Sequence, residues 1–119
     1  IILKKKVREE KAIQRIRDIL DELNGAELYD LFQEFEQKTT MEAKIANALD
    51  KLEVQLQHNH ADIKTWEELE YALPYVMDKH VEFNNTLMQL KELIVQESEV
   101  KLSDAGLDLK EMQAKSKLL

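Results

Sequence analysis

Glycine and proline are almost absent from this sequence: its 119 residues include two glycines and one proline. These residues supply the backbone angles that tight turns require, so the chain cannot build the many hairpins of an all-β fold. Ala, Leu, Glu, Lys and Gln, which favour helices, dominate instead. We therefore predict an all-α fold, an irregular bundle of about five to six helices that forms a single domain over residues 1–119.

The charge and the missing cysteines narrow the class of protein. The formal net charge is −7, which disfavours nucleic acid as a partner because phosphate backbones need a basic surface. The run Lys4-Lys5-Lys6 is too short to reverse this and is typical of a solvated helix face. Without cysteine the chain has neither disulfides nor thiolate metal sites, which favours a cytoplasmic location. No apolar run is long enough to span a membrane, so we expect no membrane partner.

Apolar residues at steps of three and four predict three helices in the first half of the chain. The first covers residues 3–23 and is stopped by Asn24-Gly25, and the second covers 26–37. The third begins with a capping box of Thr39 and Glu42 and runs to Gln57. Its predicted inward stripe consists of Ile45, Leu49, Leu52 and Leu56.

The second half is predicted to be more irregular. Residues 58–64 are polar and indicate a loop, after which Thr65 and Glu68 form a second capping box for a short helix. Pro74 ends or kinks that helix, and a long helix follows over residues 75–100. The remaining predicted features are a break at residues 103–106 and a last helix, 109–117, capped by Asp108 and Glu111.

The third helix carries two acids beside its predicted apolar stripe. Asp50 and Glu53 lie one turn apart on the same flank as Ala46 and Gln57, and the small alanine leaves space beside them. A carboxylate at the edge of a core needs a partner, because burial of an unpaired charge is costly. That partner is either a Lys or Arg side chain or a metal ion, and the spacing alone favours the structural ion pair.

Three segments of the sequence recur in one known family. They are Glu9-Glu10-Lys11-Ala12-Ile13, the stretch ELYDLFQEFE at 27–36, and TMEAKIANALDKLE at 40–53 with Gln55 and Gln57 after it. In order and spacing these segments resemble the HD-domain family that includes bacterial 5′-deoxynucleotidases and their eukaryotic relatives. The resemblance covers residues 7–57 and becomes loose after Trp66.

The resemblance implies a metal-dependent phosphohydrolase. In the family a His, a His-Asp pair and a later Asp hold a divalent ion, which is Mn, Co, Fe, Ni, Zn or Mg, and the later Asp corresponds to Asp50. The ion would bind a phosphate oxygen and activate water. The resemblance gives Glu53, Gln57, Glu34 and Glu36 supporting or structural roles around the site. We expect Glu34 and Glu36 to pair with basic residues of the first helix.

The sequence departs from the family pattern in its histidines. It has no His-Asp dipeptide, and His58, His60 and His80 all follow Asp50. His58 and His60 are interpreted as part of a solvated loop rather than as a metal-binding pair. The family's general acid/base is absent too, so we expect no catalytic residue within these residues. The start on Ile1-Ile2-Leu3, without Met, favours the C-terminal portion of a larger HD domain over a degenerate homologue.

Two functions follow as predictions. The first is hydrolysis of a nucleotide-like phosphate substrate, a nucleoside or deoxynucleoside 5′-monophosphate. We expect these 119 residues by themselves to be inactive. The alternative is a non-catalytic helical interaction or scaffold protein, suggested by the acidic surface and by Met77 and Met88. A four-helix di-metal carboxylate protein is excluded because no Glu-x-x-His pair occurs. The resemblance also allows a homodimer, with candidate contacts at Tyr75, Val76, Met77 and Phe83.

Overall fold

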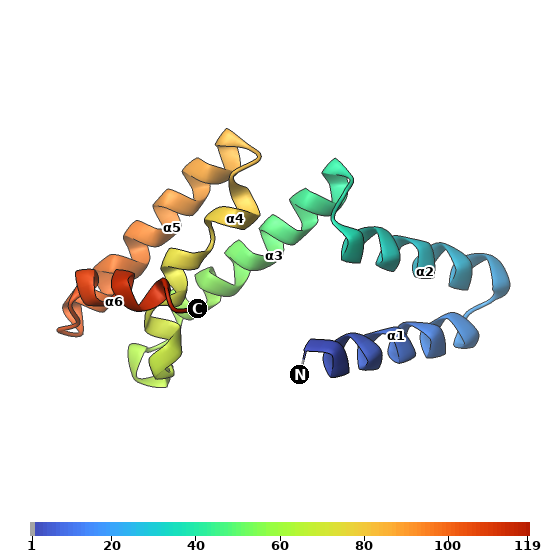
Figure 1. Cartoon of the computed structure of the whole chain (residues 1–119), viewed down its shortest axis with the longest axis horizontal. Coiled ribbons are helices and arrows are strands. Elements are labelled where there is room, and N and C mark those ends of the chain that lie inside the picture. The colour runs from blue at the N-terminus through green and yellow to red at the C-terminus, as the bar shows by residue number, and fades with distance from the viewer. Residues whose placement is uncertain (1) are drawn as a thin grey trace. The chain divides into compact units, whose positions relative to one another are not determined.

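The computed structural model describes residues 2–119, and Ile1, where the apolar start noted above begins, lies outside them. Every regular element in the described part is helical, which confirms the all-α prediction (Figure 1). The chain forms two compact units, one that ends at Lys44 and one from Ile45 to Leu119, and the prediction of a single domain stays a prediction. The α-helices are α1 (Ile2–Ile19), α2 (Glu22–Gln37), α3 (Met41–His60), α4 (Asp78–Val81), α5 (Asn85–Asp104) and α6 (Leu109–Ser116). The 3₁₀ helices are η1 (Ile63–Thr65), η2 (Glu68–Tyr71) and η3 (Leu73–Val76).

The first unit is built on a hairpin of α1 and α2 (Figure 1). The predicted stop at Asn24-Gly25 is wrong, because α2 begins at Glu22 and contains both residues. Asp21 caps α2, and its carboxylate accepts a hydrogen bond from the Asn24 backbone N–H at 2.9 Å. Gly25 is buried in the first turn of α2, where it faces the end of α1.

The helix α3 begins and ends differently from the prediction. Its cap is Thr40 rather than Thr39, since Thr40 Oγ1 accepts a hydrogen bond from the Ala43 N–H at 3.2 Å. The capping box with Glu42 is therefore wrong, because Ala43 occupies the position three residues after the cap. The helix continues to His60, so His58 and His60 lie in its last turn and not in a loop.

The buried face of α3 is also rotated from the predicted stripe. Ile45 and Leu49 are exposed, with 36% and 49% of their surface accessible, whereas Leu52 is buried and the half-buried Leu56 packs against the core as predicted. The reason is that polar residues occupy part of the buried face and make hydrogen bonds to α5. The buried residues of this face are Ala43, Asn47, Ala48, Leu52, Gln55 and Asn59.

A buried polar network connects α3 with α5 in the second unit. Ser98 Oγ lies 2.8 Å from Asn59 Oδ1, and Gln55 Nε2 donates to the same Asn59 oxygen at 3.1 Å. Asn59 Nδ2 donates in turn to the backbone carbonyl of Ile94 at 3.2 Å. Apolar residues pack beside this network and form the core, namely Ala48, Leu52, Met77, Val81, Leu87 and Ile94.

The segment between α3 and α5 consists of short helical turns rather than two helices. Glu67 and Glu70 form the capping box of η2, so the predicted box of Thr65 and Glu68 is wrong. Pro74 lies at the start of η3, where its missing N–H costs nothing. The predicted long helix 75–100 is broken, because the Asn84 side chain accepts from the Leu87 N–H at 3.0 Å and so caps α5.

Two other predictions concern the surface and the C-terminus. Met77 belongs to the core, whereas Tyr75, Val76 and Phe83 are half-buried, and the homodimer contact at these residues stays a prediction. The last helix is confirmed, because Asp108 caps α6 by accepting from the Lys110 and Glu111 N–H groups.

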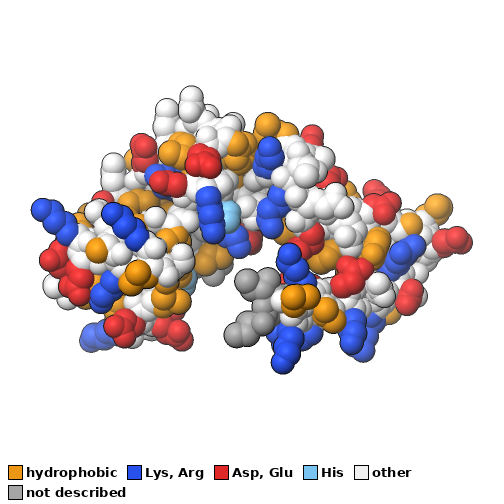
Figure 2. Space-filling model, viewed as in Figure 1, with side chains coloured by type: hydrophobic (Ala, Val, Ile, Leu, Met, Phe, Trp, Pro, Cys, Tyr) orange, Lys and Arg blue, Asp and Glu red, His pale blue; other side chains and the backbone are white. Residues whose placement is uncertain are grey.

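Acidic and basic side chains are interspersed with apolar ones on the face shown in Figure 2. Within residues 2–119, every helix is too short or too polar to span a bilayer.

Candidate functional site

Asp50, the predicted metal ligand, lies on the exposed side of α3. More than half of its side chain is accessible, and the Lys51 Nζ lies 3.8 Å from its Oδ2. The carboxylate is therefore not at the edge of the core, where the sequence pattern had placed it. An exposed ion pair of this length contributes little to stability. Asp50 remains free to engage a ligand that reaches this side of the helix.

Glu53 and Gln57 interact with each other one turn further along α3. The Gln57 side-chain amide donates a hydrogen bond to Glu53 Oε1, and both residues are exposed. The spacing of four residues brings the two side chains together on one helix face. Within the described part of the chain, neither side chain bonds to Asp50, whose partner is Lys51.

Glu34 and Glu36, also predicted to have supporting roles, belong to the first unit. Glu34 Oε2 accepts a hydrogen bond from the Thr40 hydroxyl at 2.5 Å, which connects the end of α2 with the cap of α3. The sequence had predicted a basic partner on the first helix instead. Glu36 lines a groove between α1 and α2, and Lys6 of α1 lines it too. Glu34 therefore has a structural role at the corner between two helices.

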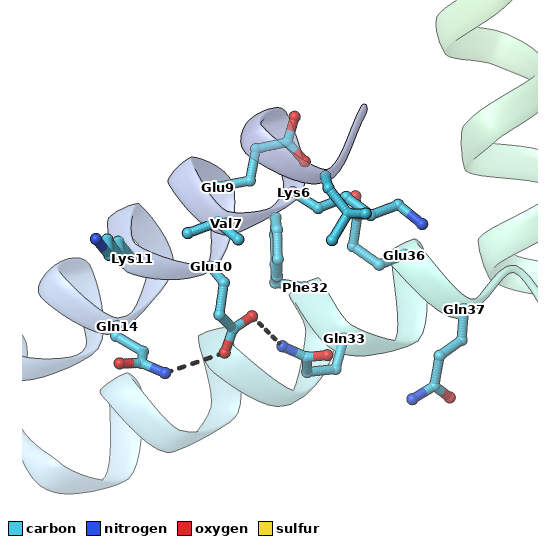
Figure 3. Close-up of a pocket in the computed structure, with 11 residues that line it drawn as sticks. Lys6, Val7, Glu9, Glu10, Lys11, Gln14, Phe32, Gln33, Glu36 and Gln37 are labelled. Carbon is cyan, nitrogen blue, oxygen red and sulfur yellow. Dashed lines mark hydrogen bonds between the residues drawn. The ribbon is translucent and has the colours of Figure 1, made fainter. Parts of the chain in front are cut away.

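The groove between α1 and α2 has a volume of about 520 Å³ and contains an ordered carboxylate, Glu10 (Figure 3). The Glu10 carboxylate accepts three hydrogen bonds. The Tyr29 hydroxyl donates to Oε1 at 2.6 Å, Gln33 Nε2 donates to Oε2 at 2.9 Å, and Gln14 Nε2 donates to Oε1 at 3.1 Å. These hydrogen bonds, with that of Tyr29 the strongest, lower the pKa of Glu10. An ionised carboxylate with three donors serves as an acceptor that joins the helices and not as a general base.

The sequence interpretation missed this cluster. The signal that would have revealed it is a pair of polar residues four apart on each helix, Glu10 with Gln14 and Tyr29 with Gln33. Two such pairs face each other when the helices form a hairpin. Arg17 adds to the cluster, because its guanidinium carbon lies 4.8 Å from the centre of the Tyr29 ring.

His58 is partly buried and has well-defined neighbours in the second unit. Its Nε2 lies 2.7 Å from Glu70 Oε2, and its backbone carbonyl accepts a hydrogen bond from Trp66 Nε1 at 2.8 Å. His80 Nδ1 lies 3.0 Å from the Asn47 side-chain nitrogen. His60, by contrast, is exposed. The interpretation of His58 as a residue of a solvated loop was therefore wrong.

Comparison with known families decides how these features are to be understood. The family model described as HD domain matches residues 2–91, which is more than half of the chain and includes all of α3. The chain belongs to the HD-domain family. No curated protein and no solved structure matches it. The HD domain places the chain in a superfamily of metal-dependent phosphohydrolases whose members typically bind divalent metal ions.

The metal centre of an HD domain does not fit the residues described here. Among residues 2–119, no three His, Asp or Glu side chains lie close enough together to hold a metal ion. Asp50 offers one carboxylate, while protein metal sites usually use about three or four ligands. The HD domain thus presents its candidate ligand without the rest of a coordination sphere.

Proposed function

We propose that this HD-domain chain serves in the hydrolysis of phosphomonoesters, with nucleoside or deoxynucleoside 5′-monophosphates as substrates, and that Asp50 is its ligand for a divalent metal. The observation that carries the proposal is the family match over residues 2–91, which includes the helix of Asp50. The exposed position of Asp50 supports it, because recruitment of that carboxylate would not disturb the core. One carboxylate does not hold a divalent ion tightly, so we expect the 119 residues alone to be inactive.

The test measures phosphate release from a panel of nucleoside 5′-monophosphates by the natural protein that contains this chain, with Mn²⁺ or Co²⁺ added. We expect Asp50→Asn to lower the rate by about 100-fold or more, because a metal ligand would be lost. Asp30→Asn is the matched control, since Asp30 is also an exposed helical Asp and the charge change is the same. Equal rates for the two variants, or no phosphate release from any nucleotide, would contradict the proposal.

A second candidate function, that of a helical interaction protein, is supported by the hairpin of the first unit. The helix α1 has seven Lys or Arg residues against three acids, whereas α2 has five acids and no Lys or Arg. Under a two-fold axis α1 of one copy would face α2 of the other, so the charges favour a second copy of this chain as the partner. Exposed apolar side chains on the hairpin would be covered, including Leu3, Val7, Ile19, Leu23 and Leu31.

Light scattering distinguishes this second candidate. We expect a dimer that the exposed substitution Leu23→Ser weakens, while Leu93→Ser, an exposed leucine of the second unit, leaves it unchanged. A chain that stays monomeric at high concentration would rule out the hairpin interface.

A further inference from the structure

A small pocket in the second unit is lined by basic side chains to which no role has been assigned above. It has a volume of about 160 Å³ and lies between α3 and the segment formed by η3 and α4. Its polar lining consists of Lys51, Gln55, His58 and His80, and Val54 and Val76 contribute to its apolar wall. Three basic side chains thus converge in one cavity, although the chain as a whole has a net charge of −7.

One atom of this pocket residue set lacks a partner. His58 Nδ1 is buried and makes no hydrogen bond, while the other ring nitrogen, Nε2, is held by Glu70 at 2.7 Å. A buried polar atom without a hydrogen bond costs about 1–3 kcal/mol, and such an atom in a native protein calls for an explanation. A bound ligand that bonds to Nδ1 would supply it.

The surrounding residues hold both imidazoles in defined orientations. The Trp66 ring lies 5.6 Å from that of His58 and stacks in turn on Tyr71 at 6.2 Å. The Asn47 side-chain nitrogen, 3.0 Å from His80 Nδ1, orients the second imidazole. Lys51 is half-exposed at the pocket and forms an exposed ion pair with Asp50 at 3.8 Å, a weak contact, so its ammonium group can turn toward a ligand. The two imidazoles are therefore oriented before any ligand arrives, which lowers the cost of binding.

Size and charge define the ligand class. A volume of 160 Å³ corresponds to about five water molecules at roughly 30 Å³ each and is smaller than the roughly 300 Å³ of pockets for nucleotide-sized ligands. Lysine and histidine side chains favour an anion. With Nε2–H donating to Glu70, Nδ1 either accepts or donates a hydrogen bond, depending on the protonation of the ring. Monohydrogen phosphate carries both a hydroxyl donor and oxygen acceptors, so it satisfies either state.

We propose that the pocket of Lys51, Gln55, His58 and His80 is a binding site for inorganic phosphate. Asp50 is not among the residues that line this pocket, and the site would bind an anion rather than a metal ion. The proposal does not rest on the proposed hydrolase function. The phosphate would bridge the Lys51 ammonium and the two imidazoles, and it would give His58 Nδ1 its missing hydrogen bond.

The experiment titrates the 119-residue chain with inorganic phosphate at constant ionic strength and follows the imidazole ¹⁵N signals by NMR. We expect saturable shifts at His58 and His80, and no comparable shift at the exposed His60. Lys51→Ala should weaken binding about tenfold or more while the fold, followed by circular dichroism and Trp66 fluorescence, is retained. His60→Gln is the matched control and should bind phosphate as the unmodified chain does.

Two results would overturn the proposal. The first is the absence of saturable shifts at His58 during the titration. The second is equal phosphate affinity in the Lys51→Ala and His60→Gln variants, which would assign the binding to charge in general. Because the measurement detects binding and not hydrolysis, its failure leaves the Asp50 experiment unaffected, and the reverse also holds.

Discussion

At the scale of single residues, Gly25 determines how closely α1 and α2 approach. A Cβ atom at this position would lie 2.4 Å from the backbone carbonyl oxygen of Arg17. Side-chain movement cannot relieve this contact because the neighbour is backbone. The glycine that the sequence suggested as a helix stop is therefore a packing residue inside a helix.

Gly25→Ala tests this role. Alanine favours a helix over glycine by about 1 kcal/mol, but the overpacking is expected to cost about 1–3 kcal/mol and the backbone contact is severe, so the variant should be less stable. Thermal or urea unfolding followed by far-UV circular dichroism measures the difference. Gly106→Ala is the comparison, since nothing lies near its Cβ and only its positive φ of 83° opposes the change. A more stable Gly25→Ala protein would show that the helices separate freely.

Tyr75 is a second residue whose environment has a measurable consequence. Its hydroxyl donates to Glu99 Oε2 at 2.9 Å. Burial, followed by this hydrogen bond, raises the pKa of Tyr75 to about 12. The protonated phenol is thus favoured in the folded state and less so in the unfolded state.

The folded chain should therefore lose stability as the pH rises from about 10 to about 12. In this window the unfolded state releases the tyrosine proton more readily, so the slope of unfolding free energy against pH is negative. Tyr75 is only half-buried, so we expect a loss on the order of 1 kcal/mol rather than the full value of the pKa shift. Urea unfolding at several pH values, compared with Tyr75→Phe, measures it. An equal slope in the variant would assign the loss to other groups.

At the scale of elements, α3 shows how a helix of the right length can present an unexpected face. Periodicity predicted Ile45, Leu49, Leu52 and Leu56 as one inward stripe. In the structure Leu52 is buried, and Asn47, Gln55 and Asn59 are buried with it. These three polar side chains make hydrogen bonds to groups on α4 and α5. Burial of a polar side chain is costly unless the side chain is hydrogen-bonded, and the hydrogen bonds to these partners remove that cost.

Two leucines on α3 separate the predicted face from the observed one. Leu52→Ala should cost about 2–5 kcal/mol of unfolding free energy, because Leu52 is fully buried in the core. Leu49→Ala should cost under about 1 kcal/mol, since half of Leu49 is exposed. Chemical unfolding followed by Trp66 fluorescence compares them. Similar losses for both variants would restore the stripe predicted from periodicity.

At the scale of the whole molecule, the two units differ in how much they bury. In the unit that ends at Lys44, the buried described residues are Ile13, Gly25 and Ala43. The unit from Ile45 to Leu119 has a contiguous core and a buried polar network. Regions with few buried apolar contacts open at low free energy.

Amide hydrogen exchange should reveal this difference. We expect the opening free energies of amides in α1 and α2 to be lower than those in α5 by about 2 kcal/mol or more. Mass spectrometry of peptides from each helix at neutral pH measures the ranking. Equal protection of α1 and α5 would mean that the first unit is stabilised as strongly as the second.

The sequence alone determined the helical class of this protein, the family to which it belongs and several helix ends. Scarce glycine and proline left few places for turns, and local signals such as the Asp108 cap and the C-terminal end of α2 at Gln37 depend on neighbouring residues only. The three segments at residues 9–13, 27–36 and 40–53 were enough to indicate the HD domain, which the family match confirms.

Only the tertiary structure decided which face of α3 is buried, that Gly25 belongs inside a helix, and that His58 lies in the last turn of α3 and lines a pocket. Each of these depends on partners distant in sequence, such as Ser98 for Asn59, Arg17 for Gly25 and Glu70 for His58. Periodicity reports that a helix has two faces, but the cost of burying a polar side chain depends on the group that meets it. That group is known only once the chain has folded.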